Sequence, residues 1–179
     1  MEEKFDVLNE FGEFTGKIAT RDECHQKGLW HRAVYAFIID KKGNVLLQKR
    51  SANKKMWPNM WDVTVGGHVD SNEFGRQSLM REAKEELGID IRDDEIKYLI
   101  GSTSINKRKN IIDKHYNECY LITKEIDITK IELQREEVSE VKYFNKKEIL
   151  ERIANNYQGL TEKTGPWNFL NKILNNYML

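Results

Sequence analysis

Three glutamates crowd into the stretch MREAKEELGI, where Glu82, Glu85 and Glu86 fall within five residues of one another. On a helix, spacings of three and four residues place these carboxylates on one face. Glu82 and Glu86 repel each other across one turn, and Glu85 and Glu86 stand near the negative C-terminal end of the helix dipole. An ordinary solvated face remains one explanation. The other is a compensating cation, since a cluster of oxygen ligands suits Mg²⁺ or Mn²⁺.

The helix that carries these glutamates is predicted from its periodicity. Residues 74–87 indicate a helix that ends at Gly88, the residue type expected just past a helix terminus. Its apolar residues recur on a different side from the acids, so we expect an amphipathic helix whose acids stay out of the core. These apolar residues are Leu79, Met80, Ala83 and Leu87.

Short apolar or alternating runs elsewhere predict strands. Residues 33–40 and 44–50, separated by Lys-Lys-Gly, predict a β-hairpin. A loop at 53–59 should lead into a short strand at 61–65. Further strands are expected at 96–105, 116–123 and 138–144.

Two helices are expected after these strands. Asn145 with Glu148 resembles a capping box that opens a helix reaching about residue 155. A last helix should start near Pro166, with apolar residues at helical spacing: Phe169, Leu170, Ile173, Leu174 and Tyr177. Residues 1–30 are expected to form an N-terminal arm or small hairpin. Strands and helices mix without regular alternation, so the chain is predicted to be a single α+β domain over residues 1–179.

The bulk composition excludes several classes of protein. Lysine and arginine together number 29, as do aspartate and glutamate, so no global field selects a nucleic-acid polymer or a membrane. The longest apolar run, residues 33–39, is too short to cross a bilayer, and the acidic start does not resemble a signal peptide. Cys24 and Cys119 alone do not make a disulfide scaffold. A cytoplasmic protein is expected.

A longer pattern surrounds the glutamates and resembles a known family. Gly67, then Glu73 after five residues, then the run REAKEELGI from Arg81 after seven more, match the nine fixed positions of the 23-residue Nudix box. The resemblance implies an α/β/α sandwich around a mixed β-sheet, with the box as a loop–helix–loop. It also implies hydrolysis, with divalent cations, of a diphosphate bond in a nucleoside diphosphate linked to another group.

The same resemblance implies roles for individual residues. Glu82, Glu85 and Glu86 would be metal ligands, together with the carbonyl of Gly66. Arg81 would orient one of these carboxylates, and Glu73 would brace the loop or reach the metal through water. The residues with expected catalytic roles are therefore Glu82, Glu86, Arg81 and Glu73. Glu82 is the first candidate for the general base, and Glu136 or Glu137 is the alternative, unless these two only cap a strand at the surface.

Several stretches outside the glutamate helix carry a second resemblance: RDECH, GLWHRA, LLQKR, KKMWPNMWD and GHV. They resemble the branch related to isopentenyl-diphosphate isomerase, a Nudix-fold enzyme that moves a proton at an alkene carbon. By this resemblance His25, His31, His68 and Glu118 would form a second metal site suited to Mn²⁺ or Zn²⁺. The alternative is that these histidines hydrogen-bond the loops of the pocket. His115 has no counterpart and is interpreted as a surface strand residue.

Two departures count against isomerase chemistry. The isomerase has its catalytic cysteine directly before Gly-His, where this chain has Gly66, and a glutamate position of the isomerase is Tyr116 here. The Nudix box is complete here, whereas that of the isomerase is degenerate. We therefore favour a hydrolase, with the isomerase as the alternative. A third reading is a non-catalytic nucleotide-binding module, which would have little reason to keep Arg81 and the helix glutamates.

The substrate side is less specified. Arg50, Lys54, Trp57 and Trp167 are the candidate substrate-binding residues, the last because Pro166-Trp167 resembles a pair over the isomerase pocket. As a charge cluster, Lys49, Arg50, Lys54 and Lys55 fit an ordinary solvated surface equally well. The expected partner is a small-molecule diphosphate, with no nucleic-acid polymer and no membrane, and both a monomer and a homodimer stay open.

Overall fold

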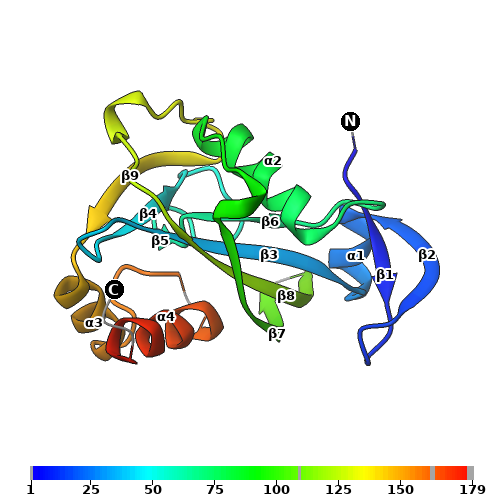
Figure 1. The fold of residues 1–179 in the computed structure, drawn as a ribbon. Helices are drawn as coiled ribbons and strands as arrows, with labels where there is room; N and C mark the ends of the chain where they lie inside the picture. The colour runs from blue at the N-terminus through cyan, green and yellow to red at the C-terminus, as the bar shows by residue number, and fades with distance from the viewer. Residues whose placement is uncertain (1, 109, 162–163, 177–179) are drawn as a thin grey trace.

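The computed structural model describes residues 2–108, 110–161 and 164–176, and within them nine strands form one mixed sheet (Figure 1). Strand β3 (Trp30–Ile39) lies at its centre and pairs with β1, β4, β6 and β8. The other strands are β1 (Lys4–Leu8), β2 (Phe14–Thr20), β4 (Val45–Arg50), β5 (Trp61–Asp62), β6 (Val65–His68), β7 (Ile96–Arg108), β8 (Ile111–Thr123) and β9 (Val138–Phe144).

Strands β3 and β8 pair in parallel, whereas the other pairs of described strands are antiparallel. It runs in unbroken register from Trp30 opposite Lys114 to Ile39 opposite Thr123. The apolar run in β3 is continuous because both faces of the strand are covered, as is usual for a buried parallel pair. This register fixes which residues of β8 lie beside which residues of β3.

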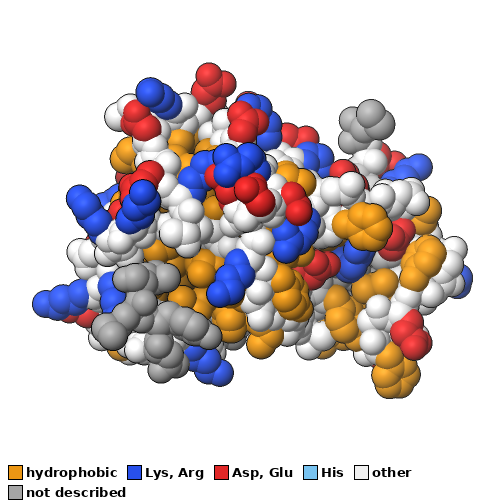
Figure 2. Space-filling model, viewed as in Figure 1, with side chains coloured by type: hydrophobic (Ala, Val, Ile, Leu, Met, Phe, Trp, Pro, Cys, Tyr) orange, Lys and Arg blue, Asp and Glu red, His pale blue; other side chains and the backbone are white. Residues whose placement is uncertain are grey.

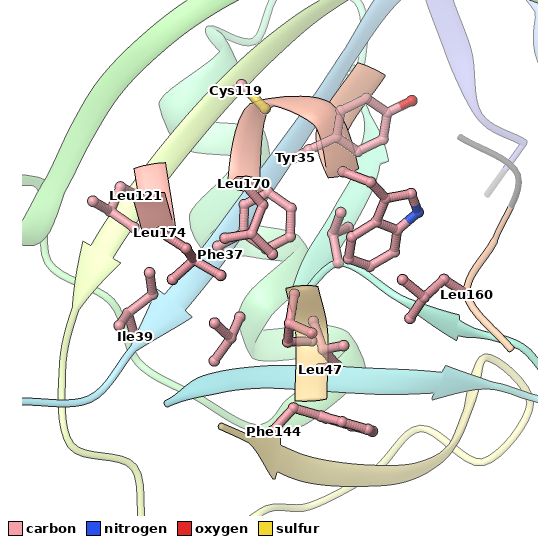
Figure 3. Packing of buried hydrophobic residues seen from close by; sticks show 14 of the residues in the cluster. Tyr35, Phe37, Ile39, Leu47, Cys119, Leu121, Phe144, Leu160, Leu170 and Leu174 are labelled. Atoms are coloured by element: carbon pink, nitrogen blue, oxygen red, sulfur yellow. The ribbon is translucent and has the colours of Figure 1, made fainter. Parts of the chain in front are cut away.

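Alternation along β3 divides the core into two layers. Val34, Ala36 and Ile38 face helix α2 (Gly75–Leu87), where they pack with Leu79, Ala83 and Leu87. Tyr35, Phe37 and Ile39 face the opposite way, toward helices α3 (Lys146–Ala154) and α4 (Thr164–Asn176). Figure 3 shows this second layer, with Phe37, Leu170 and Leu174 in one cluster. The predicted α/β/α sandwich is confirmed.

The box helix and the last strand follow the sequence prediction closely. Helix α2 starts one residue after Phe74 and ends at Gly88, which takes the left-handed conformation at φ +68°. Strand β9 matches the predicted range 138–144. At the start of α3, the Asn145 side chain accepts a hydrogen bond from the Glu148 backbone N–H at 2.9 Å. Local signals sufficed here because caps and periodicity act within a few residues.

Other predicted boundaries are wrong. The single strand expected at 61–65 is divided into β5 and β6, which pair with β4 and β3 respectively. Strands β7 and β8 extend beyond their predicted ranges because they form one long antiparallel hairpin. Tyr177, expected on the last helix, lies outside the described residues.

The first thirty residues contain the antiparallel pair β1–β2, where an arm or small hairpin was expected. They also contain helix α1 (Arg21–Lys27), which was not predicted. The Ser71 backbone N–H donates to the Lys4 carbonyl at 2.7 Å, and the Ser71 hydroxyl donates to Asp6 at 2.8 Å. The hairpin therefore supports the loop that precedes α2. Phe5, Val7, Ala19 and Cys24 form its small core.

The surface in the view of Figure 2 mixes acidic and basic side chains, as expected from equal numbers of each. Among the described helices, none is both long and apolar enough to span a membrane. Cys24 and Cys119 are both free and buried.

Candidate active site

One cleft of about 660 Å³ contains both groups of residues that the sequence singled out for metal binding. The helix glutamates and Arg81 line one part of it, and His25 and His68 line another. Gly66 and Gly67, which directly precede His68 on β6, also line the cleft. The two predicted centres are therefore neighbours in one concave site.

Gly67 makes room for Glu82. A Cβ atom at this position would collide with the carboxylate of Glu82, which reaches from α2 onto strand β6. Gly67 pairs with Val34 in the antiparallel ladder, so its backbone cannot move away without disturbing the sheet. The first glycine of the box is thus needed for the close approach of a helix carboxylate to a strand.

Arg81 is held by several carboxylates at once. Its Nη1 donates to Glu82 at 3.0 Å and to Glu85 at 3.2 Å, and its Nη2 donates to Glu73 at 3.2 Å. Glu73 also accepts a hydrogen bond from the Ser78 hydroxyl. Charge-assisted bonds of this kind fix geometry, so Glu73 orients Arg81 and Arg81 orients Glu82 and Glu85.

The prediction that all three helix acids stay out of the core is wrong for Glu86. It is only 8 % exposed, because it follows Leu79 by seven residues and so lies two turns further along the apolar face. Its Oε2 accepts a hydrogen bond from Nε2 of Gln48 on β4 at 3.0 Å. Burial raises the pKa of Glu86 to about 8 and that of Glu82 to about 7, since it penalises the charged carboxylate. The side chain of Glu85 is 54 % exposed.

Five potential ligands form the second group. His25, His31, His68, Asp113 and His115 each offer one ligand atom, and these atoms lie within 4.8 Å of one another. They come from four elements: α1, β3, β6 and β8. Asp113 Oδ1 lies 2.7 Å from His115 Nε2 and 3.2 Å from His25 Nε2. We refer to these five residues as the histidine cluster.

Burial favours the neutral form of three imidazoles in the histidine cluster, those of His25, His31 and His68. His31 Nδ1 donates to the Leu29 carbonyl at 2.9 Å, which directs the lone pair of Nε2 toward His115 and Asp113. Burial lowers the pKa of His31 to about 3 and that of His68 well below its usual value. Although burial alone would raise the pKa of Asp113, the adjacent His115 side chain lowers it to about 2. A carboxylate beside neutral imidazoles is the state in which such side chains bind metals.

Two predictions about this cluster are wrong. Glu118 is not a member, because successive strand residues face opposite sides of the sheet and Glu118 points to the other face from Asp113 and His115. Its carboxylate lies against Gly75 at the positive end of α2 and accepts a hydrogen bond from the Tyr120 hydroxyl.

His115, taken from the sequence as a surface residue, is 5 % exposed and belongs to the cluster. Its position opposite His31 in the β3–β8 register, together with Asp113 two residues earlier, is the signal that was missed. That register is not evident from one strand alone.

The substrate-side candidates separate into two groups. Arg50, Lys54 and Trp57 line the cleft. Arg50 also braces its own loop, donating to the Met56 carbonyl at 3.0 Å and to Asp62 at 3.2 Å. Lys54 forms an ion pair with Glu137, which lines the cleft together with Glu136.

The position of Trp167 contradicts the prediction that this residue binds substrate. Its side chain is fully buried, with its ring 5.8 Å from that of Phe37 and its Nε1 donating to the Thr161 carbonyl at 2.8 Å. It belongs to the core layer under α4, because the face of α4 that carries it is the face that packs on the sheet.

Comparisons with known proteins agree with the box and the fold. Residues 29–163 match the family model described as the NUDIX domain. An uncharacterized Nudix hydrolase of Listeria monocytogenes is 33% identical over 173 residues, covering 97% of this chain and 94% of that protein. Nudix hydrolase 3 of Arabidopsis thaliana is 37% identical over 147 residues, covering 79% of this chain but only 19% of that longer protein.

A crystal structure of a Deinococcus radiodurans protein superposes with a TM-score of 0.70 at 22% identity, covering 95% of this chain and 98% of that one. At this identity the superposition shows the fold alone. The family model and the Listeria relative, each extending over most of the chain, establish more than the fold. With its complete box and its glutamate-lined cleft, this chain belongs to the Nudix hydrolase family.

Proposed function

We propose that this protein is a divalent-metal-dependent hydrolase that cleaves the phosphoanhydride bond of a nucleoside diphosphate, free or linked to another group. The observation that carries the proposal is the burial of Glu82 and Glu86 at this cleft, where Arg81 donates to Glu82 and, among the described residues, Glu86 is bonded only by the neutral amide of Gln48. Burying carboxylates is costly unless a positive charge compensates it. A divalent cation bound by these carboxylates would supply that compensation and would still have positions open for the oxygens of a diphosphate.

The donor set fits Mg²⁺ or Mn²⁺. The ligands would be carboxylate oxygens of Glu82, Glu85 and Glu86 with the backbone carbonyl of Gly66, all hard oxygen donors. When bound, the cation neutralises the diphosphate, polarises the P–O bond and lowers the pKa of water. Gly67 supports this assignment, since it admits the Glu82 carboxylate to the strand.

The chain's own residues would position the substrate and move the proton. Arg81, held by Glu73, orients Glu82 and Glu85. Glu82 is the proposed general base, because burial raises the pKa of its carboxyl to about 7, close to the pH at which a base works best. Glu136 or Glu137, which also line the cleft, is the alternative base. Arg50, Lys54 and Trp57 would contact the phosphates and the base of the nucleotide.

We also propose that the histidine cluster binds a second metal ion, of a borderline kind such as Zn²⁺ or Mn²⁺. Four imidazoles and one carboxylate suit these ions better than Mg²⁺. His25 Nε2 and Asp113 Oδ1 are buried and lie 3.2 Å apart, yet among the described residues neither atom has a hydrogen-bond partner, which argues for a ligand beyond the protein itself. The hydrogen bond of His31 to Leu29 orients that ring in the manner of an outer-shell partner.

Asp113→Asn tests the second centre. We expect the purified parent to carry about one more equivalent of Zn²⁺ or Mn²⁺ than Asp113→Asn or His68→Ala, because each change removes a ligand. Metal content would be measured by mass spectrometry after dialysis. Glu118→Gln is the matched control, since Glu118 lies on the other face of β8, and its content should equal that of the parent. Equal Zn²⁺ or Mn²⁺ content in the parent and all three variants would exclude metal binding by the histidine cluster.

Isomerase chemistry is the alternative that this cleft supports less well. Gly66 faces Tyr35 across β3 and β6 and has no side chain that could move a proton. Its Cβ position is already crowded, at 3.1 Å from Val63 and 3.3 Å from Tyr35. Among the described residues that line the cleft there is no cysteine. A non-catalytic binding module would not require the network that holds Arg81.

A substrate panel separates these functions. Nucleoside di- and triphosphates, nucleotide sugars and isopentenyl diphosphate would be incubated with the protein and Mg²⁺ or Mn²⁺, with phosphate release and product masses measured. We expect hydrolysis of at least one nucleotide. An allylic isomer from isopentenyl diphosphate, without hydrolysis, would favour the alternative. Tight binding with no turnover of any compound would favour the binding module.

A further inference from the structure

Glu86 is the helix glutamate that depends most on its surroundings. It is 8 % exposed, whereas Glu85 is open to solvent, and it does not share the Arg81 bonds of Glu82 and Glu85. Among the described residues, Gln48 is the one hydrogen-bond donor to its carboxylate, at 3.0 Å. The orientation of Glu86 is therefore set by a residue outside the Nudix box, 38 positions earlier in the sequence.

Gln48 is itself rigidly placed. It is 4 % exposed and lies inside strand β4, where its backbone stands opposite Asp62 of β5 on one side and Val141 of β9 on the other. It follows Leu46 by two residues and so faces the α2 layer, as Leu46 does. A side chain that starts from a strand paired on both edges can hold a partner at a fixed place.

The chemistry of an amide suits this position. Gln48 donates one hydrogen bond and brings no charge, so it fixes the carboxylate without competing with a cation for it. A lysine or arginine here would form a buried ion pair with Glu86 and occupy the place of the metal. Holding Oε2 fixes the plane of the carboxylate while Oε1 stays available to a cation.

We propose that Gln48 is a positioning residue for the metal centre of α2, acting through Glu86. This inference rests on the proposed function, because it assigns Glu86 to cation binding. Gln48 touches no reacting atom in this scheme. Its effect should appear in metal affinity first, and in turnover only through the metal.

Gln48→Met tests the proposal, since methionine keeps the length of the side chain and removes the donor. We expect Mn²⁺ to bind about tenfold more weakly, or weaker still, at the sites that Glu86→Gln also weakens, as is usual when an outer-shell partner is lost. Binding would be followed by electron paramagnetic resonance of free Mn²⁺. Gln48→Asn, which keeps the amide but draws it back by one methylene, should behave in the same way.

Thr64→Val is the matched control. Thr64 is fully buried in the same sheet and accepts a hydrogen bond from the Ile38 N–H at 2.9 Å, so its loss removes a buried bond without touching Glu86. This variant should lose stability and keep the Mn²⁺ affinity of the parent. A general loss of structure would instead weaken Mn²⁺ binding in all three variants.

A double-mutant comparison decides whether Gln48 acts through Glu86. In a Glu86→Gln background, Gln48→Met should cause no further loss of Mn²⁺ affinity. An equal loss in both backgrounds, or unchanged affinity in Gln48→Met alone, would overturn the proposal. These results are distinguishable from a failure of the proposed function: a protein that hydrolyses nothing can still show the coupling, and an active hydrolase can lack it.

Discussion

Glu86→Gln should lower kcat on the hydrolysed diphosphate by about a thousandfold, because losing a metal ligand removes several kcal/mol of transition-state stabilisation. The metal-free variant should also be more stable than the parent at pH 8.5, by on the order of 2 kcal/mol. Steady-state kinetics at saturating Mg²⁺ and denaturant unfolding with a chelator present would measure the two effects. A residue kept for folding would show the opposite change in stability.

The sign of the stability change follows from the pKa. Burial raises the pKa of Glu86 from 4.5 to about 8, so the folded protein binds more protons than the unfolded chain between these values. Stability of the parent therefore falls as the pH rises through this window, and glutamine removes that contribution to the fall. Above pH 8 the carboxylate is charged and buried, and the variant should gain most.

Glu85→Gln is the matched control for this pair of effects. Its side chain is 54 % exposed, so we expect a loss of activity with no comparable gain in stability. Unchanged turnover in Glu86→Gln would contradict the assignment of Glu86 to cation binding. A Glu86→Gln variant that is less stable than the parent at every pH would show that the carboxylate holds the fold together.

Trp167→Ala should destabilise the protein by about 3–5 kcal/mol, the usual cost of emptying a large buried aromatic site. This is a large part of the free energy of unfolding of a typical domain, which is about 5–15 kcal/mol. Trp167 is fully buried against Phe37 and donates a hydrogen bond to Thr161. Alanine would lose both the packing and the hydrogen bond. Denaturant unfolding followed by far-ultraviolet circular dichroism would measure the change.

Kinetics separate this role from substrate binding. In the folded fraction of Trp167→Ala, KM for the hydrolysed nucleotide should stay near that of the parent. Phe74→Ala, at a side chain that is 74 % exposed, is the control for loss of an aromatic ring without loss of core. If Trp167→Ala instead has nearly the stability of the parent and a raised KM, Trp167 contacts the substrate.

The sequence predicted what depends on local spacing. The box could be recognised in one stretch because Gly67, Glu73 and Arg81 lie in one continuous segment of strand, loop and helix, and their roles were inferred from the resemblance. The end of α2 at Gly88 and the start of α3 at Asn145 followed from caps for the same reason. Glu86 was misplaced although the needed information was present, since a count of seven from Leu79 puts it on the buried face.

The rest depended on pairings between distant strands. Asp113 and His115 join His31 only through the parallel register of β3 with β8, and nothing within β8 specifies that register. The resemblance implied Glu118 in their place, but Glu118 lies on the opposite face of β8. Trp167 was assigned to the pocket in the same way, whereas its burial depends on how α4 packs on the sheet.

Strand β6 makes both proposed centres depend on one register. Gly67, opposite Val34, faces α2 and Glu82, while Gly66 and His68, opposite Tyr35 and Ala33, face the other way. A slip of β6 by a single residue would exchange these faces, because side chains alternate along a strand. It would press an imidazole against Glu82 and leave glycine among the histidines. An insertion or deletion in this four-residue strand should therefore abolish metal binding at both proposed centres, while point substitutions can remove either centre alone.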